Sequence, residues 1–370
     1  MASNETSEWA HLDQNYTGNF SGEYFVETLP SNTMVTLSVI FGLSVLLSAG
    51  SNIMVALVLI TGNRKKNTFN VFLLNLAISD WTLSTISLPF LFHATMAAEW
   101  KFGSKMCTAV PLILKVSQLS SIFTLTAIGI ERYRAVVHPL LPPITTAKKT
   151  CAVAFIWLAA LLISFPKLKF MSTVRYLIDG REIELCGERW PETHDPDLKV
   201  VYVWGLFTLT YMLPMVTLLV CYIRTGCKLL RDRIPGNFDT GLNSLQNRAK
   251  RKAFRTLVSV VILFAVCWLP GNLYNLVVIT YNQHYLLNHQ DLTMTLRACL
   301  YIWVVLTDAL VNPIVYMFLS ESFALEIRRL KLSCLKRLGT GVVREGPSTT
   351  RTRSTTYSLR SLTSSSKRSF

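Results

Sequence analysis

Acidic side chains stand inside two strongly apolar stretches of this chain. Asp308 is the only charged residue in the stretch 298–320, where Asn312 and Pro313 follow it, and Asp80 ends the stretch LNLAISD. Asp308 and Asn312 are four residues apart, so they can face the same side of a helix. An unpaired carboxylate in apolar surroundings tends to bind a proton or to need a cation beside it. These residues therefore predict an ion or proton site inside a membrane.

Two aspartates within a membrane could also indicate a protease that cuts there. Such enzymes need a GxGD-type sequence beside one acid, and neither ISDWT around Asp80 nor LTDAL around Asp308 contains one. No cysteine or histidine spacing typical of a metal site occurs either. The sequence therefore does not indicate an enzyme.

The elements that carry these residues are predicted to be transmembrane helices. The chain is 51% hydrophobic and only 16% charged, whereas a soluble domain carries roughly 25% charged residues. Apolar runs long enough to cross a bilayer, about 20 residues, recur seven times, near residues 34–61, 70–97, 106–136, 150–170, 200–223, 256–281 and 298–319. The predicted fold is an all-α bundle of seven transmembrane helices over residues 34–319.

Charges between the runs predict the orientation. Residues 1–33 hold five acids, no Lys or Arg, and three N-x-S/T sequons at Asn4, Asn15 and Asn19, as in a glycosylated extracellular tail. With that tail outside, 27 of the 37 Lys and Arg residues fall in inner segments, beside only six acids. This matches the positive-inside rule. We therefore expect a multi-pass plasma-membrane protein, whose basic excess reflects orientation and not nucleic-acid binding.

Beyond the seventh run, residues 320–338 have an amphipathic pattern that predicts an eighth helix on the inner membrane face, where anionic lipid would favour its basic side. Cys334 in this segment is a candidate for palmitoylation, with an unmodified thiol as the alternative. Residues 339–370 hold fifteen Ser or Thr among 32 residues and predict a disordered cytoplasmic tail with kinase sites.

Two of the eight cysteines fall clearly in outer segments. Cys107 opens the third run, and Cys186 lies midway through the second outer loop. Because conditions outside the cell are oxidising, we expect a disulfide between them.

Taken together, the motifs resemble those of a rhodopsin-class G-protein-coupled receptor over about residues 34–335. The motifs occur in the family's order, one or more in each run: GSNIMV, LNLAISD, Cys107 with ERYRAVVHPL, Trp157, Pro214 with Tyr222, FAVCWLP, and NPIVY. The resemblance implies a receptor that activates a heterotrimeric G protein, with receptor kinases and arrestin acting on the tail.

The resemblance also implies an activation switch. Arg132, which stands between Glu131 and Tyr133, would be released from Glu131 and would then contact the G protein. Leu140 would contact the G protein as well; the alternative is a leucine that only lies at the membrane interface. Proline-bent helices can pivot. The further members of the switch implied by the family are Tyr222, Phe264, Trp268, Pro270, Asn312, Pro313 and Tyr316, although Phe264 and Trp268 could serve packing alone.

In the family fold, Asp80, Ser121, Trp268 and Asn312 surround a polar pocket that holds a sodium ion in the inactive state. Relatives usually have Asn at the place of Asp308, so this chain departs from the pattern. Two acids in one pocket repel unless a cation or proton lies between them. We expect either tighter sodium binding or a shared proton; the alternative is a protonated Asp308 that acts like Asn.

Two residues that this chain lacks narrow the class of ligand. Opsins carry a lysine where this chain has Leu306, and amine receptors carry an aspartate where it has Leu114. Trp100 in EWKFG is common in peptide receptors, and CGERWPE resembles the second outer loop of receptors for neuropeptide FF, orexin and cholecystokinin. That loop is long enough for a hairpin lid. Candidate ligand-binding residues are Lys115, Gln118, Glu188, Trp190, Asn272 and Asn275.

The charged candidates favour ligand groups of opposite sign. Glu188 could pair with an arginine of a peptide, or belong to a solvated loop. Lys115, if it faces inward, favours an anionic group, although it could snorkel outward. We expect an extracellular neuropeptide as the ligand. The alternative is an orphan or decoy receptor with a lipid or small-molecule ligand or constitutive activity, but decoys usually have damaged ERY or NPxxY motifs, and both are intact here.

A channel or proton transporter is a further alternative. It would need polar groups across the membrane, and the first, fourth and fifth runs offer almost none.

Overall fold

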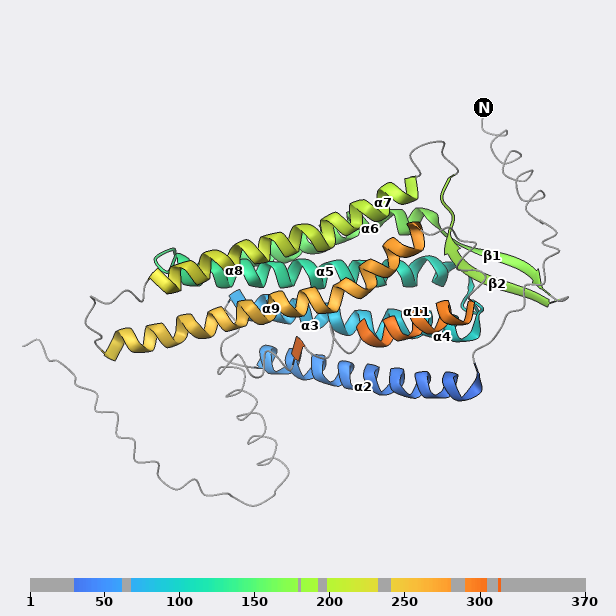
Figure 1. Ribbon diagram of the computed structural model, residues 1–370, viewed down its shortest axis with the longest axis horizontal. Coiled ribbons are helices and arrows are strands. Elements are labelled where there is room, and N and C mark those ends of the chain that lie inside the picture. Colours follow the sequence, from blue (N-terminus) through green and yellow to red (C-terminus); the bar gives the residue numbers. More distant parts are fainter. Residues whose placement is uncertain are drawn as a thin grey trace, which may run out of the picture. The chain divides into compact units, whose positions relative to one another are not determined.

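A computed structural model describes residues 30–61, 68–178, 181–191, 198–231, 241–280, 290–304 and 312–313. Long helices running beside one another dominate these residues (Figure 1). In chain order they are α2 (Ser31–Thr61), α3 (Thr68–Thr82), the π-helical turn η1 (Leu83–Ser87), α4 (Leu88–Ala97), α5 (Gly103–Val137), α6 (Thr146–Phe170), α7 (Leu198–Phe207), the π-helical turn η2 (Thr208–Met212), α8 (Leu213–Arg231), α9 (Gly241–Thr280) and α11 (Gln290–Val304).

Five of the described helical segments are long and apolar enough to cross a membrane. They are Ser31–Thr61, Thr68–Ala97, Gly103–Val137, Thr146–Phe170 and Leu198–Leu229, and they fall on the first five predicted runs. The sixth predicted run falls on α9, and the seventh begins in α11. The predicted eighth helix at 320–338 and the tails at 1–33 and 339–370 lie outside the described residues, apart from a few at the start of α2.

Large apolar side chains cover the outer surface of the bundle, and small hydroxyl side chains lie buried between its helices. Leu46 and Phe155 leave 70% and 71% of their surface exposed, whereas Ser48 and Ser121 are fully buried. Lipid tails are as apolar as leucine, so apolar side chains gain little by turning inward. Small hydroxyl residues between helices allow close approach and hydrogen bonding, which is the arrangement expected of a transmembrane bundle.

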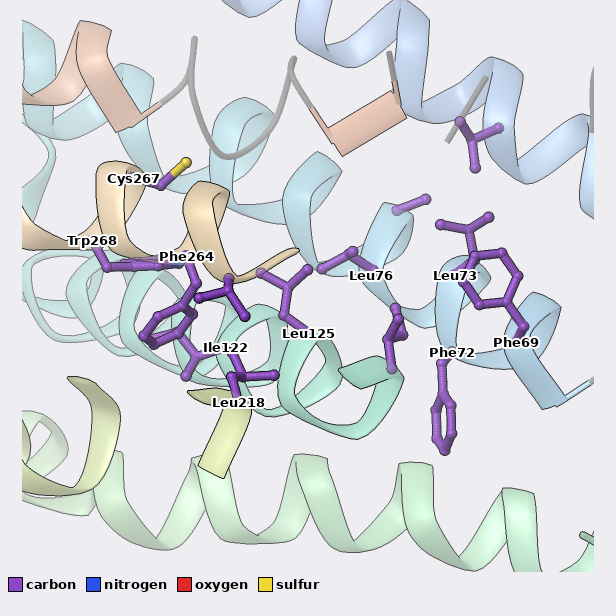
Figure 2. Close-up of a cluster of buried hydrophobic side chains, with 14 of the residues drawn as sticks. Phe69, Phe72, Leu73, Leu76, Ile122, Leu125, Leu218, Phe264, Cys267 and Trp268 are labelled. Atoms are coloured by element: carbon purple, nitrogen blue, oxygen red, sulfur yellow. The ribbon is translucent and has the colours of Figure 1, made fainter. Parts of the chain in front are cut away.

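The largest buried cluster joins α2, α3, α5, α8 and α9, together with Tyr211 of η2. It includes Leu76 of α3, Ile122 and Leu125 of α5, Leu218 of α8 and Phe264 of α9. Figure 2 shows these side chains gathered between their helices. Because α5 contributes to this cluster and to a second one with α6, it is the central helix of the bundle.

Two spans are interrupted by a π-helical turn just before a proline. In the second span η1 ends at Ser87 and Pro89 follows, and in the fifth span η2 ends at Met212 and Pro214 follows. A proline lacks an N–H and crowds the preceding turn, and a locally wider π turn accommodates it. Pro270 lies inside α9, which continues to Thr280.

The second outer loop forms a β-hairpin at one end of the bundle (Figure 1). Strands β1 (Met171–Ile178) and β2 (Arg181–Glu188) pair antiparallel, with Thr173 opposite Cys186. A disulfide joins Cys186 to Cys107 at the outer end of α5, as predicted. The backbone N–H of the buried Trp100 donates to the Glu184 carbonyl at 2.7 Å. The hairpin is thus fixed to the helices by a covalent bond and by the first outer loop.

Candidate functional site

Asp80 joins three separate parts of the chain at the centre of the bundle. Its carboxylate is fully buried. The Ser121 hydroxyl of α5 donates to its Oδ1, and the Asn312 Nδ2 donates to its Oδ2 at 3.0 Å. Each carboxylate oxygen therefore has a donor, as a buried acid requires. The structure brings together three of the residues that the sequence assigned to one polar site.

A short series of hydroxyls extends this cluster to α2. The Ser84 hydroxyl donates to the Asp80 carbonyl at 2.8 Å and accepts from the Ser48 hydroxyl at 3.1 Å. The Asn52 amide donates to the Ser48 carbonyl at 3.0 Å. Sequence reasoning missed Ser48 and Ser84. Serines are frequent in the chain, and the only available signal concerned Ser84, which stands four residues after Asp80.

Trp268 lies in the largest buried apolar cluster, beside Phe264 (Figure 2). Its indole N–H is buried and has no hydrogen-bond partner in the part of the chain that the structure describes. The oxygens of Asp80, Ser121 and Ser84 are hard donors of the kind that small hard cations bind. The chemistry of this set fits the predicted sodium ion, while Asp308 lies outside the described residues.

A second polar seam holds α3, α5 and α6 together. The Asn75 amide donates to the Thr124 hydroxyl at 2.7 Å, and its carbonyl oxygen accepts from the Trp157 indole at 2.8 Å. The Ser79 hydroxyl donates to that of Ser120 at 2.8 Å. Both side-chain groups of Asn75 are used across helix boundaries, so this residue sets the mutual position of three helices.

At the inner end of α5, Arg132 is held on two sides. Its Nε lies 3.5 Å from Glu131 Oε2, and its guanidinium carbon lies 3.7 Å from the centre of the Phe69 ring of α3. About a fifth of each charged side chain is exposed, 22% for Arg132 and 16% for Glu131. The ion pair with Glu131 was predicted, whereas the ring of Phe69 was not.

The loop between α5 and α6 leaves the side chain of Leu140 exposed. The Arg134 guanidinium donates to the Pro142 carbonyl at 2.7 Å, and the rings of Tyr133 and His138 meet edge to face with centroids 5.8 Å apart. Leu140 between these contacts is 98% exposed. The loop therefore carries an exposed apolar side chain, beside the exposed Leu141, where the sequence predicted a contact with a partner.

The predicted aromatic residues of α8 and α9 form two separate groups. Tyr222 stacks on Phe254 with centroids 5.2 Å apart. Farther along, Phe264 stacks on Tyr211, and that ring stacks on Phe207, at 5.8 and 5.6 Å. The second group links the outer half of the fifth span to Phe264, a connection that sequence motifs alone did not indicate.

Glu188 at the end of β2 is already engaged within the chain. Its Oε1 pairs with the Lys167 ammonium, and its Oε2 accepts from the Trp190 indole at 2.7 Å. Trp190 packs between Phe170 and Tyr202, with ring centroids 4.2 and 5.2 Å away. Both oxygens of Glu188 thus have donors within the chain, and its pairing with a peptide arginine stays a prediction.

The other predicted ligand-binding residues differ in their surroundings. The Lys115 ammonium donates to the Gln118 amide oxygen at 3.1 Å in a partly buried position. The Asn272 amide donates to the Trp268 carbonyl at 2.8 Å, within its own helix, and Asn275 is exposed. Lys115 and Gln118 thus form a pair, whereas the two asparagines do not join them.

Arg297 of α11 was missed by the sequence analysis. Its Nε donates to the Tyr274 hydroxyl of α9 at 2.8 Å, so it joins the outer parts of the sixth and seventh spans. A signal existed, since Arg297 is the only Lys or Arg between Arg255 and Arg328.

Several predicted positions lie outside the described residues and stay predictions. They are Asn4, Asn15, Asn19, Asp308, Tyr316 and Cys334.

Comparison with known proteins adds the following matches. A family model described as 7 transmembrane receptor (rhodopsin family) matches residues 51–316. The tachykinin-like peptides receptor 86C of Drosophila melanogaster is 32% identical over 314 residues, covering 83% of this chain and 60% of the fly protein. The tachykinin-like peptides receptor 99D of the same fly is 29% identical over 85% of this chain and 61% of its own length. The substance-K receptor of Bos taurus is 30% identical over 75% and 71%, respectively. The chain thus spans about three fifths of the length of the two fly receptors.

Proposed function

This chain belongs to the rhodopsin family of seven-transmembrane receptors, and from this membership we propose that it binds an extracellular peptide and activates a heterotrimeric G protein. Three similar proteins are named as receptors for tachykinin-like peptides or substance K. Those names, the hairpin over the outer end of the bundle and the exposed Leu140 at the inner end support the proposal. The proposed place is the plasma membrane, with the amino terminus outside.

The observation that carries the proposal is the position of Asp80. One buried carboxylate accepts hydrogen bonds from Ser121 on the third span and from Asn312 on the seventh. A helix that moves against its neighbours must break or exchange these bonds. The cluster therefore gives the bundle two alternative arrangements, which is what a receptor needs to pass a signal across a membrane.

The stacked rings of Phe207, Tyr211 and Phe264, the aromatic row, are proposed to connect the ligand side with the Asp80 cluster. Phe207 and Tyr211 of the fifth span stack in turn toward Phe264, which shares the buried core with Trp268. In the proposed mechanism, a peptide bound at the outer end shifts this row, and the inner part of α9 then swings outward. Tyr222 would leave Phe254 in the same motion and approach Tyr316.

At the inner end, the proposed event is the release of Arg132. The outward swing of α9 would leave Arg132 free to contact the G protein, and Leu140 would insert into a groove of the G protein. Receptor kinases and arrestin are proposed to act afterwards on the tail at 339–370. The segment 320–338, with a palmitoyl group on Cys334, is proposed to rest on anionic lipid.

A sodium ion is proposed as an allosteric ligand of the resting receptor. Asp80 and Ser121 would hold it, with the Ser84 hydroxyl close by and Asp308 as a second acid. The ion supplies a positive charge beside a carboxylate that the surrounding bundle cannot solvate. Movement of the helices that carry these oxygens would disperse the site and release the ion.

The test is guanine-nucleotide exchange in cells that express the full chain, measured against a panel of neuropeptides. At least one peptide is expected to promote exchange, and Arg132→Ala is expected to abolish the response while the receptor still reaches the cell surface. Clear binding of a lipid, together with silence toward every peptide, would overturn the proposed ligand class.

A further inference from the structure

Two lysines meet between the outer ends of α5 and α6. On α5, Lys115 lies about one turn from both Leu112 and Leu119, which pack in one apolar cluster with Ile163 of α6. On α6, Lys167 lies one turn beyond Ile163. Residues three or four apart share a helix face, so both lysines stand on the facing sides of these helices. Like charges on facing helices repel one another.

Only one of the two lysines has an acidic partner. Glu188 pairs with Lys167 and is held in place by the Trp190 indole. Lys115 donates to the neutral amide of Gln118, and no carboxylate oxygen lies within 4.0 Å of its ammonium group among the described residues. The group therefore carries an excess of positive charge in a place where an unpaired charge is costly.

Nearby polar atoms are also left without partners. The Ser164 hydroxyl, three residues before Lys167, is fully buried and has no hydrogen-bond partner in the described part of the chain. Buried hydroxyls are normally satisfied. A hydroxyl on α6 without an acceptor and an ammonium on α5 without an acidic partner suit an oxygen-rich anion better than a neutral or cationic group.

We propose that Lys115, with Lys167 beside it, anchors an acidic group of the ligand, either a carboxylate or a sulphate. The inference rests on the proposed function, since it assigns the chemistry of the same peptide site. Gln118 orients the Lys115 ammonium, and Glu188 keeps Lys167 and the hairpin in place, so Lys115 is the direct partner. The preferred peptides therefore carry an exposed acid at the end that enters the bundle.

The first experiment measures nucleotide exchange with matched peptides on the full-length receptor. Each neuropeptide of the panel is made with a carboxyl terminus as free acid or amide, and each tyrosine peptide with or without sulphate. On wild type the acidic form is expected to be at least about tenfold more potent. The two comparisons separate a carboxylate from a sulphate as the group recognised.

Variants at Lys115 assign the preference to this residue. Lys115→Gln is expected to remove the preference for the acidic form, and Lys115→Arg to keep most of it. Lys101→Gln serves as the matched control, because it removes the same charge from an outer loop where the side chain is 58% exposed. Equal potency of acidic and neutral forms on wild type, or an unchanged preference in Lys115→Gln, overturns the inference.

A second measurement decides the matter even if no peptide promotes exchange, in which case the proposed function itself fails. The unfolding temperature of the purified receptor is compared in sodium sulphate and sodium chloride at equal ionic strength. Sulphate is expected to stabilise wild type by about 2 °C more than Lys115→Gln, with Lys101→Gln behaving as wild type. Equal shifts in wild type and Lys115→Gln would mean that no anion site exists there.

Discussion

The guanidinium of Arg132 lies over the ring of Phe69, with 3.7 Å between its central carbon and the ring centre. This contact ties the inner end of α5 to α3, and Glu131 holds the same arginine from its own helix. The arginine that would contact a G protein is therefore kept by an aromatic face as well as by an acid.

Replacing Phe69 by Leu is expected to raise nucleotide exchange in the absence of ligand. A cation over an aromatic ring contributes about 0.5–2 kcal/mol, so its loss corresponds to a roughly two- to thirtyfold shift toward released Arg132. Basal exchange per receptor at the cell surface measures this. Phe72→Leu is the matched control, since Phe69 and Phe72 are both 5% exposed in the same buried cluster. Equal basal exchange in the two variants would exclude a role for the ring.

Replacing Asn75 by Ala is expected to destabilise the bundle by about 1–3 kcal/mol, because the partly buried Trp157 indole loses its acceptor and the Thr124 hydroxyl keeps only its bond to the Ser120 carbonyl. The unfolding midpoint of the purified receptor measures the loss. Asn275→Ala, at an exposed position of α9, should leave the midpoint unchanged. A midpoint for Asn75→Ala equal to that of the control would show that the seam does not hold the helices.

Much of this fold could be predicted because the membrane imposes it. An apolar run of about 20 residues has to be a helix, since no water is present to bond its backbone. The first five runs, the outer disulfide and the hairpin followed from this constraint and from topology, and they are confirmed. The resemblance to rhodopsin-class receptors is confirmed by the family match. The π turns before Pro89 and Pro214 could not be predicted, because helix periodicity carries no sign of one extra residue.

Agonist affinity should depend on sodium through Asp80. If the ion stabilises the resting bundle, added sodium lowers agonist affinity in wild type, and Asp80→Asn should make the affinity independent of sodium. Asp308→Asn should shift the curve toward higher sodium concentration, because one of two acids is lost. Sodium curves that coincide in wild type and Asp308→Asn would remove Asp308 from the cation site. Potassium at equal ionic strength is the control for general salt effects.

Breaking the ion pair between Lys167 and Glu188 should loosen the hairpin. Both side chains are about four fifths buried, so Glu188→Gln leaves an unpaired ammonium and should cost about 3 kcal/mol. Faster hydrogen exchange of the β2 amides measures this, and exchanging the two residues, Lys167→Glu with Glu188→Lys, should restore part of the protection. Glu184→Gln, whose partner Arg175 is 74% exposed, should have little effect. Protection unchanged in Glu188→Gln would contradict the assignment.

The site was harder to predict than the fold, because sequence motifs name residues but not their partners. Asp80 and Asn312 stand in family motifs, and the resemblance placed Ser121 in the same pocket; the three side chains do meet. Glu188 was taken for a free acid, because its bond to Lys167 joins a loop to a helix 21 residues away in sequence. Phe69 belongs to no motif, and only its contact with Arg132 reveals it. Arg297 stands out in sequence as an isolated basic residue, but only its hydrogen bond to Tyr274 shows what it joins.

Reconstitution of the purified receptor with a G protein tests whether peptide binding on one side of the membrane produces nucleotide exchange on the other. Purified full-length receptor and G protein are combined in lipid, and peptide binding and nucleotide exchange are measured on the same sample. The account predicts a peptide that binds to saturation and promotes exchange, with Arg132→Ala retaining binding and losing exchange. A peptide that saturates the receptor without any exchange, or exchange that is undiminished in Arg132→Ala, would contradict it.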